Sequence, residues 1–267
     1  MTRIYSEPTV DVQSQPDYRM IEIDKVGVKD IAYPIGVLER SGGTQHTVAS
    51  VSMYVNLPHH FKGTHMSRFV ELLNEYCNDM STTSIPGILL QMRKRLEAKQ
   101  AHIEVTFPFF MKKLAPVSRA EGLMSYECTV RGFGNDEVTL EIEVKVPITA
   151  LCPCSKAISE QGAHNQRGTV TVRFRQSRFV WIEEIIQIVE ASASCDVYSV
   201  LKREDEKYVT ERAYENPMFV EDVARAVATR LQKHKGITWF AVEVENQESI
   251  HAHNAYAFLK RSNQESD

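Results

Sequence analysis

Apolar and polar residues alternate without interruption over residues 138–148, and this feature most restricts how the chain can fold. Side chains in a β-strand point to opposite faces in turn, so the pattern predicts a long strand with one buried face. A strand needs partners for its backbone hydrogen bonds, which predicts a sheet. The apolar positions are Val138, Leu140, Ile142, Val144, Val146 and Ile148.

Similar patterns recur along the chain in a definite order. Alternation predicts further strands at 47–56, at about 237–246 and at about 252–260, and apolar residues at helical spacing predict helices over 67–79 and 180–192. The order strand, strand, helix, helix, strand, strand occurs twice, with a period near half the chain. Short turns between strands favour antiparallel pairing, so we expect an α+β fold with helices on one sheet face.

Length and composition set the expected organisation of the chain. We predict an N-terminal tail over 1–20, a first unit over 21–135 and a second unit over 136–267, which includes a helix beginning at Pro217. The net charge of −4 argues against a nucleic-acid or membrane-surface partner. The sequence lacks a run of about 18 apolar residues, so we expect no transmembrane helix. Five cysteines without a secretory signal predict reduced thiols in the cytoplasm.

Two cysteines separated by one residue follow directly after the long alternating strand. In an extended chain, Cys152 and Cys154 would share a face without the geometry of a disulfide, and either thiolate could bind a metal or attack carbon. Two buried thiols at a strand end would explain the pair equally well. His164, ten positions after Cys154, tips the balance because it adds a third potential metal ligand. Arg167 follows in the same polar segment.

Three later segments carry further candidate groups. Glu248 precedes His251 and His253, which would point the same way in a strand and would need partners if buried, or would contact solvent at a sheet edge. The charged run around Glu206 is expected to form a solvated loop, with Glu206 as a candidate metal ligand or base. Glu221 lies in the first turn of a predicted helix, where it could suit the helix dipole or pair with adjacent N–H donors of a ligand.

Residues 61–68, Phe-Lys-Gly-Thr-His-Met-Ser-Arg, concentrate polar donors at the start of a predicted helix. Such a position suits a phosphate group, because backbone N–H groups and basic side chains converge there. The donors are Lys62, His65, Ser67 and Arg68. A helix cap with scattered charges is the alternative interpretation, and the density of donors favours the phosphate site.

Taken together, these segments resemble the prokaryotic GTP cyclohydrolase type IB family. The resemblance is carried by 61–68, 152–156 and 162–167, by Asp205-Glu206-Lys207 and Pro217–Asp222, and by Ser249–Asn254, and it runs from about residue 20 to 260. It implies a tunnelling fold with two units per chain, each a four-stranded antiparallel sheet with two helices. It also implies a homotetramer with active sites between subunits.

The resemblance further implies conversion of GTP to 7,8-dihydroneopterin triphosphate and formate, the entry to folate biosynthesis. Attack of a metal-activated water at C8 of guanine would open the imidazole ring. The residues that match metal ligands are Cys152, His164, Glu206 and His251, and the metal would be zinc, manganese or iron. The matching catalytic residues are Cys152, Cys154, His164 and Glu248. Glu221 would anchor the purine, and the triphosphate would meet Lys62, His65, Ser67, Arg68 and Arg167.

Three other functions remain open at this point. A tunnelling-fold nitrile reductase would use a cysteine nucleophile and NADPH, without a metal. An archaeal-type relative would release a cyclic phosphate product. A non-catalytic oligomer would use the cysteine and histidine cluster to hold a structural zinc with all four positions filled by protein.

Overall fold

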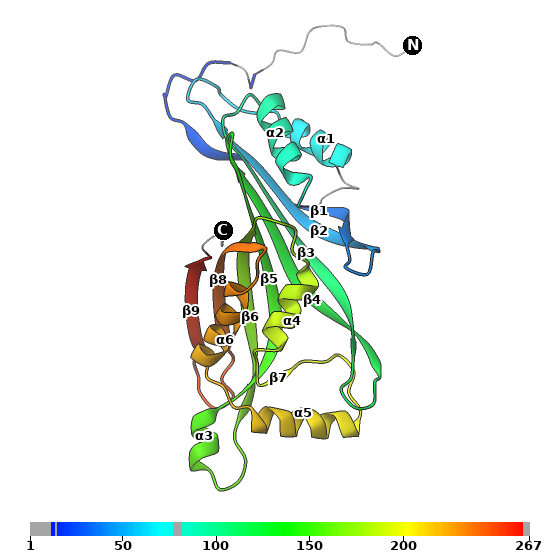
Figure 1. Ribbon diagram of the computed structural model, residues 1–267. Coiled ribbons are helices and arrows are strands. Elements are labelled where there is room, and N and C mark those ends of the chain that lie inside the picture. The colour runs from blue at the N-terminus through cyan, green and yellow to red at the C-terminus, as the bar shows by residue number, and fades with distance from the viewer. Residues whose placement is uncertain (1–11, 14, 77–81, 264–267) are drawn as a thin grey trace, which may run out of the picture.

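A computed structural model describes residues 12–13, 15–76 and 82–263 (Figure 1). These residues form an α+β fold, with six helices and one nine-stranded antiparallel sheet. Most of the predicted tail, residues 1–11 and 14, lies outside the described residues. None of the helices in the described ranges is long and apolar enough to cross a bilayer.

The N-terminal half, as named here, comprises β1 to β4 with α1 and α2. Its two helices follow β2, and α2 packs against β3 and β4. The element bounds are β1 Ile23–Leu38, β2 Thr44–Leu57, α1 Met66–Tyr76, α2 Ile85–Arg95, β3 Ala101–Leu114 and β4 Glu121–Gly134.

The C-terminal half comprises the rest of the described chain and has additional elements. Helix α4 packs against β5, and α6 packs against β8 and β9. The bounds are β5 Val138–Leu151, α3 Pro153–Ile158, β6 Asn165–Gln176, α4 Ile182–Glu190, β7 Cys195–Asp196, α5 Arg203–Glu215, α6 Val220–Gln232, β8 Ile237–Asn246 and β9 Ala255–Ser262.

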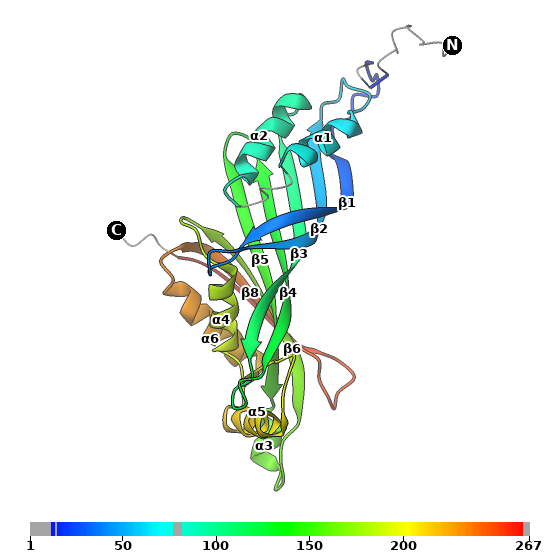
Figure 2. The same ribbon diagram turned by 90° about the vertical axis from the view of Figure 1, so that its right-hand side faces the viewer.

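A single sheet runs through both halves in the order β1-β2-β3-β4-β5-β6-β8-β9, with β7 paired to β5. The halves meet where β4 pairs with β5, from Glu127 opposite Lys145 to Gly134 opposite Val138. The predicted boundary after residue 135 falls in the short turn that joins these two strands. Figure 2 shows the sheet twisting strongly along its length, as expected for many adjacent strands.

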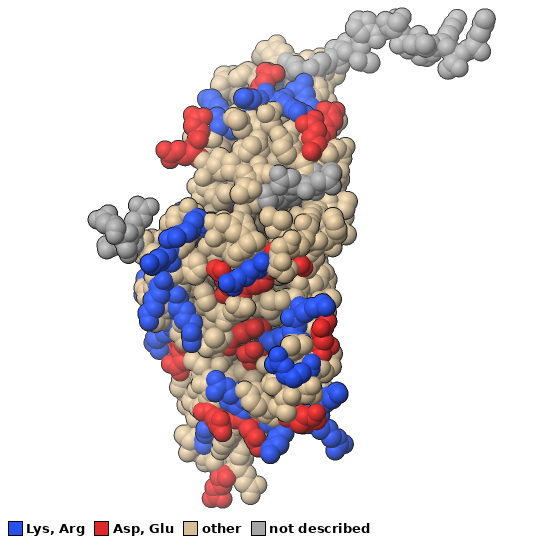
Figure 3. All heavy atoms as spheres, turned by 45° about the vertical axis from the view of Figure 1, so that its right-hand side comes forward, with Lys and Arg blue, Asp and Glu red and all other residues tan. Residues whose placement is uncertain are grey.

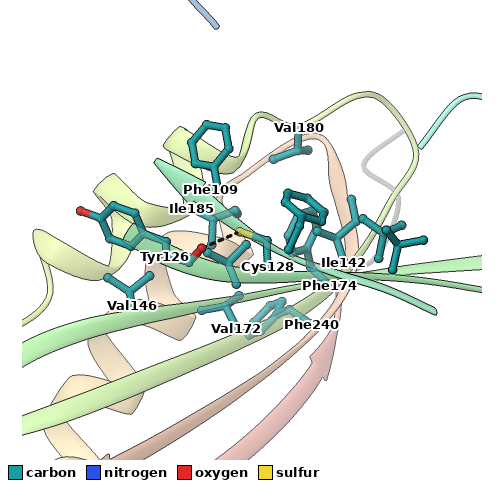
Figure 4. Close-up of a cluster of buried hydrophobic side chains, with 14 of the residues drawn as sticks. Phe109, Tyr126, Cys128, Ile142, Val146, Val172, Phe174, Val180, Ile185 and Phe240 are labelled. Carbon is teal, nitrogen blue, oxygen red and sulfur yellow. Dashed lines mark hydrogen bonds between the residues drawn. The ribbon is translucent and has the colours of Figure 1, made fainter. Parts of the chain in front are cut away.

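The helix-covered face of the sheet holds the hydrophobic core, and the alternation in the sequence explains why. Ile142, Val144 and Val146 of β5 are at most 3% exposed and point to this face. Figure 4 shows Ile142 and Val146 among side chains of β4, β6 and β8, with the Cys128 sulfur donating to the Tyr126 carbonyl. Burial raises the pKa of the Cys128 thiol, so this cysteine serves as an apolar core residue.

The opposite face of the sheet is polar and carries ion pairs between adjacent strands. Arg131 of β4 contacts Glu104 of β3 at 2.8 Å and Glu143 of β5 at 2.9 Å, and Arg173 of β6 lies 3.7 Å from Glu143. The row therefore crosses the junction between the two halves. Figure 3 views the molecule from the helix-covered side, where basic and acidic side chains are also interspersed over the C-terminal half.

The charged run of residues 203–210 is helical, so the predicted solvated loop is wrong. It forms the start of α5, because the carboxylate of Asp205 is fully buried and accepts four hydrogen bonds. The donors are the backbone N–H groups of Val117, Ser118 and Lys202, at 2.8 to 2.9 Å, and the Ser118 hydroxyl at 2.6 Å. Burial alone would raise the pKa of Asp205, but these bonds outweigh it and hold the pKa well below its ordinary value.

Helix α6 begins at Val220, three residues later than the predicted start at Pro217. The reason is that the backbone N–H of Met218 donates to the carbonyl of Leu151 at 3.1 Å, which ties this segment to the end of β5. Phe219 then caps the helix with an extended backbone. The prediction of a helix here is confirmed, and its first turn lies close to the cysteine pair.

Candidate active site

The paired cysteines lie where β5 ends and α3 begins. Cys152 is the N-cap residue of α3, and its sulfur accepts a hydrogen bond from the Ser155 N–H at 3.4 Å. Pro153 suits the first turn of a helix, because its fixed φ is helical and its missing N–H would have no partner there. The extended Cys-Pro-Cys segment predicted above is therefore wrong. Cys154 lies within α3 and is exposed, whereas Cys152 is half-buried.

His164 lies across from Cys152, immediately before β6. The Cys152 N–H donates to the His164 carbonyl at 3.1 Å, and the His164 N–H donates to the Ser155 hydroxyl at 3.1 Å. Gly162 has a φ of 77°, a left-handed conformation that favours glycine and allows the chain to turn back before His164. The fold thus brings two of the predicted site residues together.

The loop of residues 247–254, between β8 and β9, lies beside the His164 ring. The Ser249 hydroxyl is 3.3 Å from Nδ1 of His164. The same Nδ1 is 2.8 Å from Oε1 of Gln166, and Nε2 of Gln166 donates to Glu248 at 3.2 Å. Glu248, a predicted catalytic residue, is therefore linked to His164 through one buried amide.

His251 and His253 lie in this loop and not in a strand, because β9 begins at Ala255. Strand alternation therefore does not explain how they lie. Their rings nevertheless stack, with centroids 5.2 Å apart and an angle of 18° between the planes. Both side chains are exposed at the end of the molecule that holds α3.

Helix α5 forms the other wall of this region. Nζ of Lys156 lies 4.3 Å above the ring of Tyr214, which joins α3 to the last turn of α5. A cavity of about 420 Å³ lies between Gly162, Ala163 and Asn165 on one side and the α5 residues Thr210 and Tyr214 on the other. Glu206 is exposed on the same helix, and its carbonyl accepts from the Thr210 hydroxyl at 2.8 Å.

The donor types gathered here, a thiol, imidazoles and carboxylates, are those that bind zinc, manganese or iron. Cys152 and His164 are paired through their backbones, whereas Glu206 and His251 lie on separate exposed segments. Across the described part of the chain, no group of three or more His, Cys, Asp or Glu side chains could hold an ion. These donor types suit a metal, although Glu206 and His251 are not grouped with the pair in the described residues.

Glu221 and Arg167 occupy exposed positions on elements that border the cysteine pair. Glu221 lies in the first turn of α6, beside Asp222, whose carboxylate accepts the Phe219 N–H at 3.1 Å. Arg167 is on β6, directly opposite Thr149 of β5. Both side chains are thus available to a ligand at this end of the sheet.

The predicted phosphate-binding residues lie at the opposite end of the molecule. Residues 62–68 include the first residues of α1, and this helix lies far from α3 and α5 in both ribbon views (Figures 1 and 2). Arg68 donates to the Arg95 carbonyl at 2.7 Å, and Nζ of Lys62 donates to Gln15 at 3.5 Å. Within one chain, this segment does not meet Cys152.

Comparison with known proteins decides the family. The model of the family described as type I GTP cyclohydrolase folE2 matches residues 9–257. The chain belongs to this family. Two curated relatives named GTP cyclohydrolase FolE2 illustrate the similarity. That of Citrifermentans bemidjiense is 55% identical over 252 residues and covers 94% of both chains. That of Syntrophobacter fumaroxidans is 55% identical over 255 residues, or 95% of this chain and 99% of the relative.

Solved structures show which fold this FolE2-family chain shares. A mutant urate oxidase of Bacillus sp. TB-90 superposes with a TM-score of 0.54 at 8% identity, covering 90% of this chain and all of the other. Uricase from Arthrobacter globiformis superposes with a TM-score of 0.50 at 9% identity, covering 90% and 93%. At such low identity the likeness concerns the fold alone.

Gln166 and Ser249 contact the His164 ring of this FolE2-family chain, and neither was among the predicted site residues. A signal for Gln166 was present, because it continues the face of β6 that Gly168, Val170 and Val172 bury. A polar side chain at the end of a buried face needs a partner. Ser249 gave no comparable signal, since its contact depends on how a loop folds over another strand.

Proposed function

We propose that this protein hydrolyses GTP to 7,8-dihydroneopterin triphosphate and formate, the first step of folate biosynthesis. The proposal rests on one observation above all. In a chain that is 55% identical to FolE2 enzymes over almost its whole length, the segments of Cys152, His164 and Glu248 converge at one end of the sheet. A cavity lies next to this region, lined by Leu151, Ala163 and Asn165, which are the chain neighbours of Cys152 and His164.

Cys152, His164, Glu206 and His251 are the residues that we propose as ligands of a divalent metal. When bound, such a cation would supply Lewis-acid activation of water at neutral pH. The backbone pairing of Cys152 with His164 supports two of these assignments. Glu206 and His251 are both exposed, and their assignment rests on the resemblance to the family.

Other residues of the chain bind the base and move protons in this proposal. Glu221 accepts hydrogen bonds from the N–H groups of guanine, which orients C8 for attack. Glu248 and Cys154 are the groups proposed to take and return protons as the imidazole ring opens and formate leaves. Glu248 is half-buried and hydrogen-bonded, so it is the more constrained of the two.

We further propose that the complete site forms between two copies of the chain. Residues 62–68 are the candidate triphosphate site, and they lie at the opposite end of the chain from Cys152 (Figure 1). A neighbouring copy would bring its own Lys62, His65, Ser67 and Arg68 to Arg167 of the first. The repeated element order of the two halves supports a description as two tunnelling-fold units, and a homotetramer is the assembly we propose.

Turnover of GTP by the purified protein with a divalent ion and without nicotinamide tests the proposal. We expect one formate per GTP and a product that becomes fluorescent neopterin after oxidation and dephosphorylation. A product mass that fits a cyclic phosphate would instead assign the archaeal-type reaction. Turnover of a deazaguanine nitrile only with NADPH would assign a nitrile reductase. Tightly held zinc without any turnover would leave a structural oligomer and would refute the proposed activity.

A further inference from the structure

Gln166 is the buried polar residue at the centre of the hydrogen bonds around His164. Its side chain is 8% exposed, although it lies at the end of a strand next to solvent-facing loops. Its oxygen is 2.8 Å from Nδ1 of His164, and its nitrogen is 3.2 Å from Oε1 of Glu248. Burying an amide is costly unless both ends are paired, and here both are.

The chemistry of the three groups fixes the direction of each hydrogen bond. An ionised Glu248 carboxylate only accepts, so the NH₂ end of the Gln166 amide must face it. The amide oxygen then faces His164, and an oxygen can only accept there. Nδ1 of His164 must therefore carry the proton, and the lone pair of the neutral ring is left on Nε2.

We propose that Gln166 is a positioning residue that fixes the tautomer of His164 and presents Nε2 as the metal-binding atom. Ser249 supports the same arrangement, because its hydroxyl at 3.3 Å can share the Nδ1 proton as a second acceptor. Partners of this kind orient the ring of a metal ligand and hold its other nitrogen free. The consequence for metal binding rests on the proposed function, whereas the tautomer itself does not.

The tautomer can be measured on the metal-free full-length chain by NMR of protein labelled with ¹⁵N in its histidine rings. The His164 signal is assigned by its loss in His164→Ala. We expect Nδ1 to be protonated in the wild type. In Gln166→Leu, the proton should move toward Nε2, as free histidine prefers. A wild-type ring protonated on Nε2 would overturn the proposal, as would a Gln166→Leu ring that keeps the wild-type tautomer.

Reversing the polarity of the bridge gives a rescue experiment. In Gln166→Glu, a carboxylate still accepts from Nδ1 but repels Glu248. Adding Glu248→Gln restores a donor on that side, so the double variant should recover the wild-type tautomer and thermal stability. If Gln166 had only a structural role, the double variant would recover stability, but Gln166→Leu would leave the His164 tautomer unchanged.

Metal affinity gives a second readout that does not depend on turnover. Competition of the apo-protein with a chelator for Zn²⁺ should show binding that is about 10- to 100-fold weaker in Gln166→Leu than in the wild type. Gln161→Leu is the matched control, because Gln161 is exposed and its hydrogen bonds with Ser159 are made by its backbone. Equal affinities in the Gln166 variant and this control would overturn the link to metal binding. Absence of GTP turnover would refute the proposed function and leave the tautomer result standing.

Discussion

The N-terminal and C-terminal halves share an element order but differ in what connects the elements. In the N-terminal half, β1 joins β2 by a short turn over 39–43, and β3 joins β4 over 115–120. In the C-terminal half, α3 is inserted between β5 and β6, and β7 and α5 are inserted between α4 and α6. The cysteine pair, Glu206 and the wall of the cavity all lie on these insertions.

In the proposed function, the two halves therefore have different tasks. Both contribute strands and covering helices to one core, but the candidate chemistry is concentrated on connections at one end of the C-terminal half. The N-terminal half offers instead the basic and polar residues before α1, at the other end of the chain. Loops and short insertions on a rigid scaffold are the usual place for catalytic groups.

The largest expected effect comes from Cys152→Ala, which removes the central thiol of the C-terminal half. We expect kcat/KM for GTP to fall by at least about 100-fold, with loss of bound metal and with the thermal transition retained. Cys195→Ala is the control. It removes a buried thiol of the same half that is not among the proposed site residues, so most activity should remain. Equal activity of the Cys152 variant and the wild type would break the assignment of chemistry to this half.

Lys62→Ala tests the task assigned to the N-terminal half and should lower kcat/KM by about 10-fold, mainly through KM, because a phosphate contact is lost. The sharper measurement mixes this variant with Cys152→Ala under conditions that exchange subunits. At GTP concentrations below KM, the activity of the mixture should exceed the mean of the two separate variants, since some interfaces would combine two intact segments. A mixture of Cys152→Ala with His164→Ala should stay inactive. Failure of the first mixture to recover would argue for a site within one chain.

Asp205→Asn tests how the N-terminal half supports α5, since this carboxylate binds the turn between β3 and β4. At pH 7 we expect the Tm to fall by more than about 5 °C, because an amide cannot accept all four hydrogen bonds. Glu204→Gln, at an exposed neighbouring position, should change the Tm little.

The pH dependence of this difference has a definite sign. The pKa of Asp205 is depressed in the folded state, so its contribution to stability is complete above the ordinary aspartate pKa. That contribution is lost as the pH falls from about 4 toward the depressed value. The gap in Tm between wild type and Asp205→Asn should therefore narrow in acid, and a gap that widens would contradict this assignment.

The smallest effect is expected from Glu104→Gln, at the N-terminal end of the row of ion pairs across the junction. Glu104 is about half exposed, so the free energy of unfolding measured in urea should fall by about 0.5 kcal/mol or less. Glu143→Gln should cost more, because Glu143 is 11% exposed and faces both Arg131 and Arg173. The reverse order would mean that the ion pairs of Glu143 at the junction stabilise the fold less than the pair of Glu104 within the N-terminal half.

Local patterns in the sequence predicted the scaffold well. The alternation over 138–148 forms β5, because in a strand it places the apolar side chains on one face, and that face can be buried. The helices over 67–79 and 180–192 correspond to α1 and α4, although residues 77–79 lie outside the described ranges. Such patterns depend on periodicity within one segment, which the chain displays directly.

The errors share a physical cause, which is dependence on distant partners. The charged run became α5 because Asp205 finds Ser118, 87 positions away in the chain. The pairing of Gln166 with Glu248 spans 82 positions. Local propensity carries no information on such contacts. Periodicity identifies the separate segments but not which of them meet in space. The resemblance to a family was therefore needed to group them into one site.

The junction between β4 and β5 also limits how this molecule can move. Only residues 135–137 connect the two strands, and the backbone pairing begins at once with Gly134 opposite Val138. A hinge between the halves would have to break that ladder. The segments 159–164 and 247–254 lie outside this ladder, so they can shift without breaking it. Domain closure of the kind seen in two-lobed enzymes is not available to this architecture.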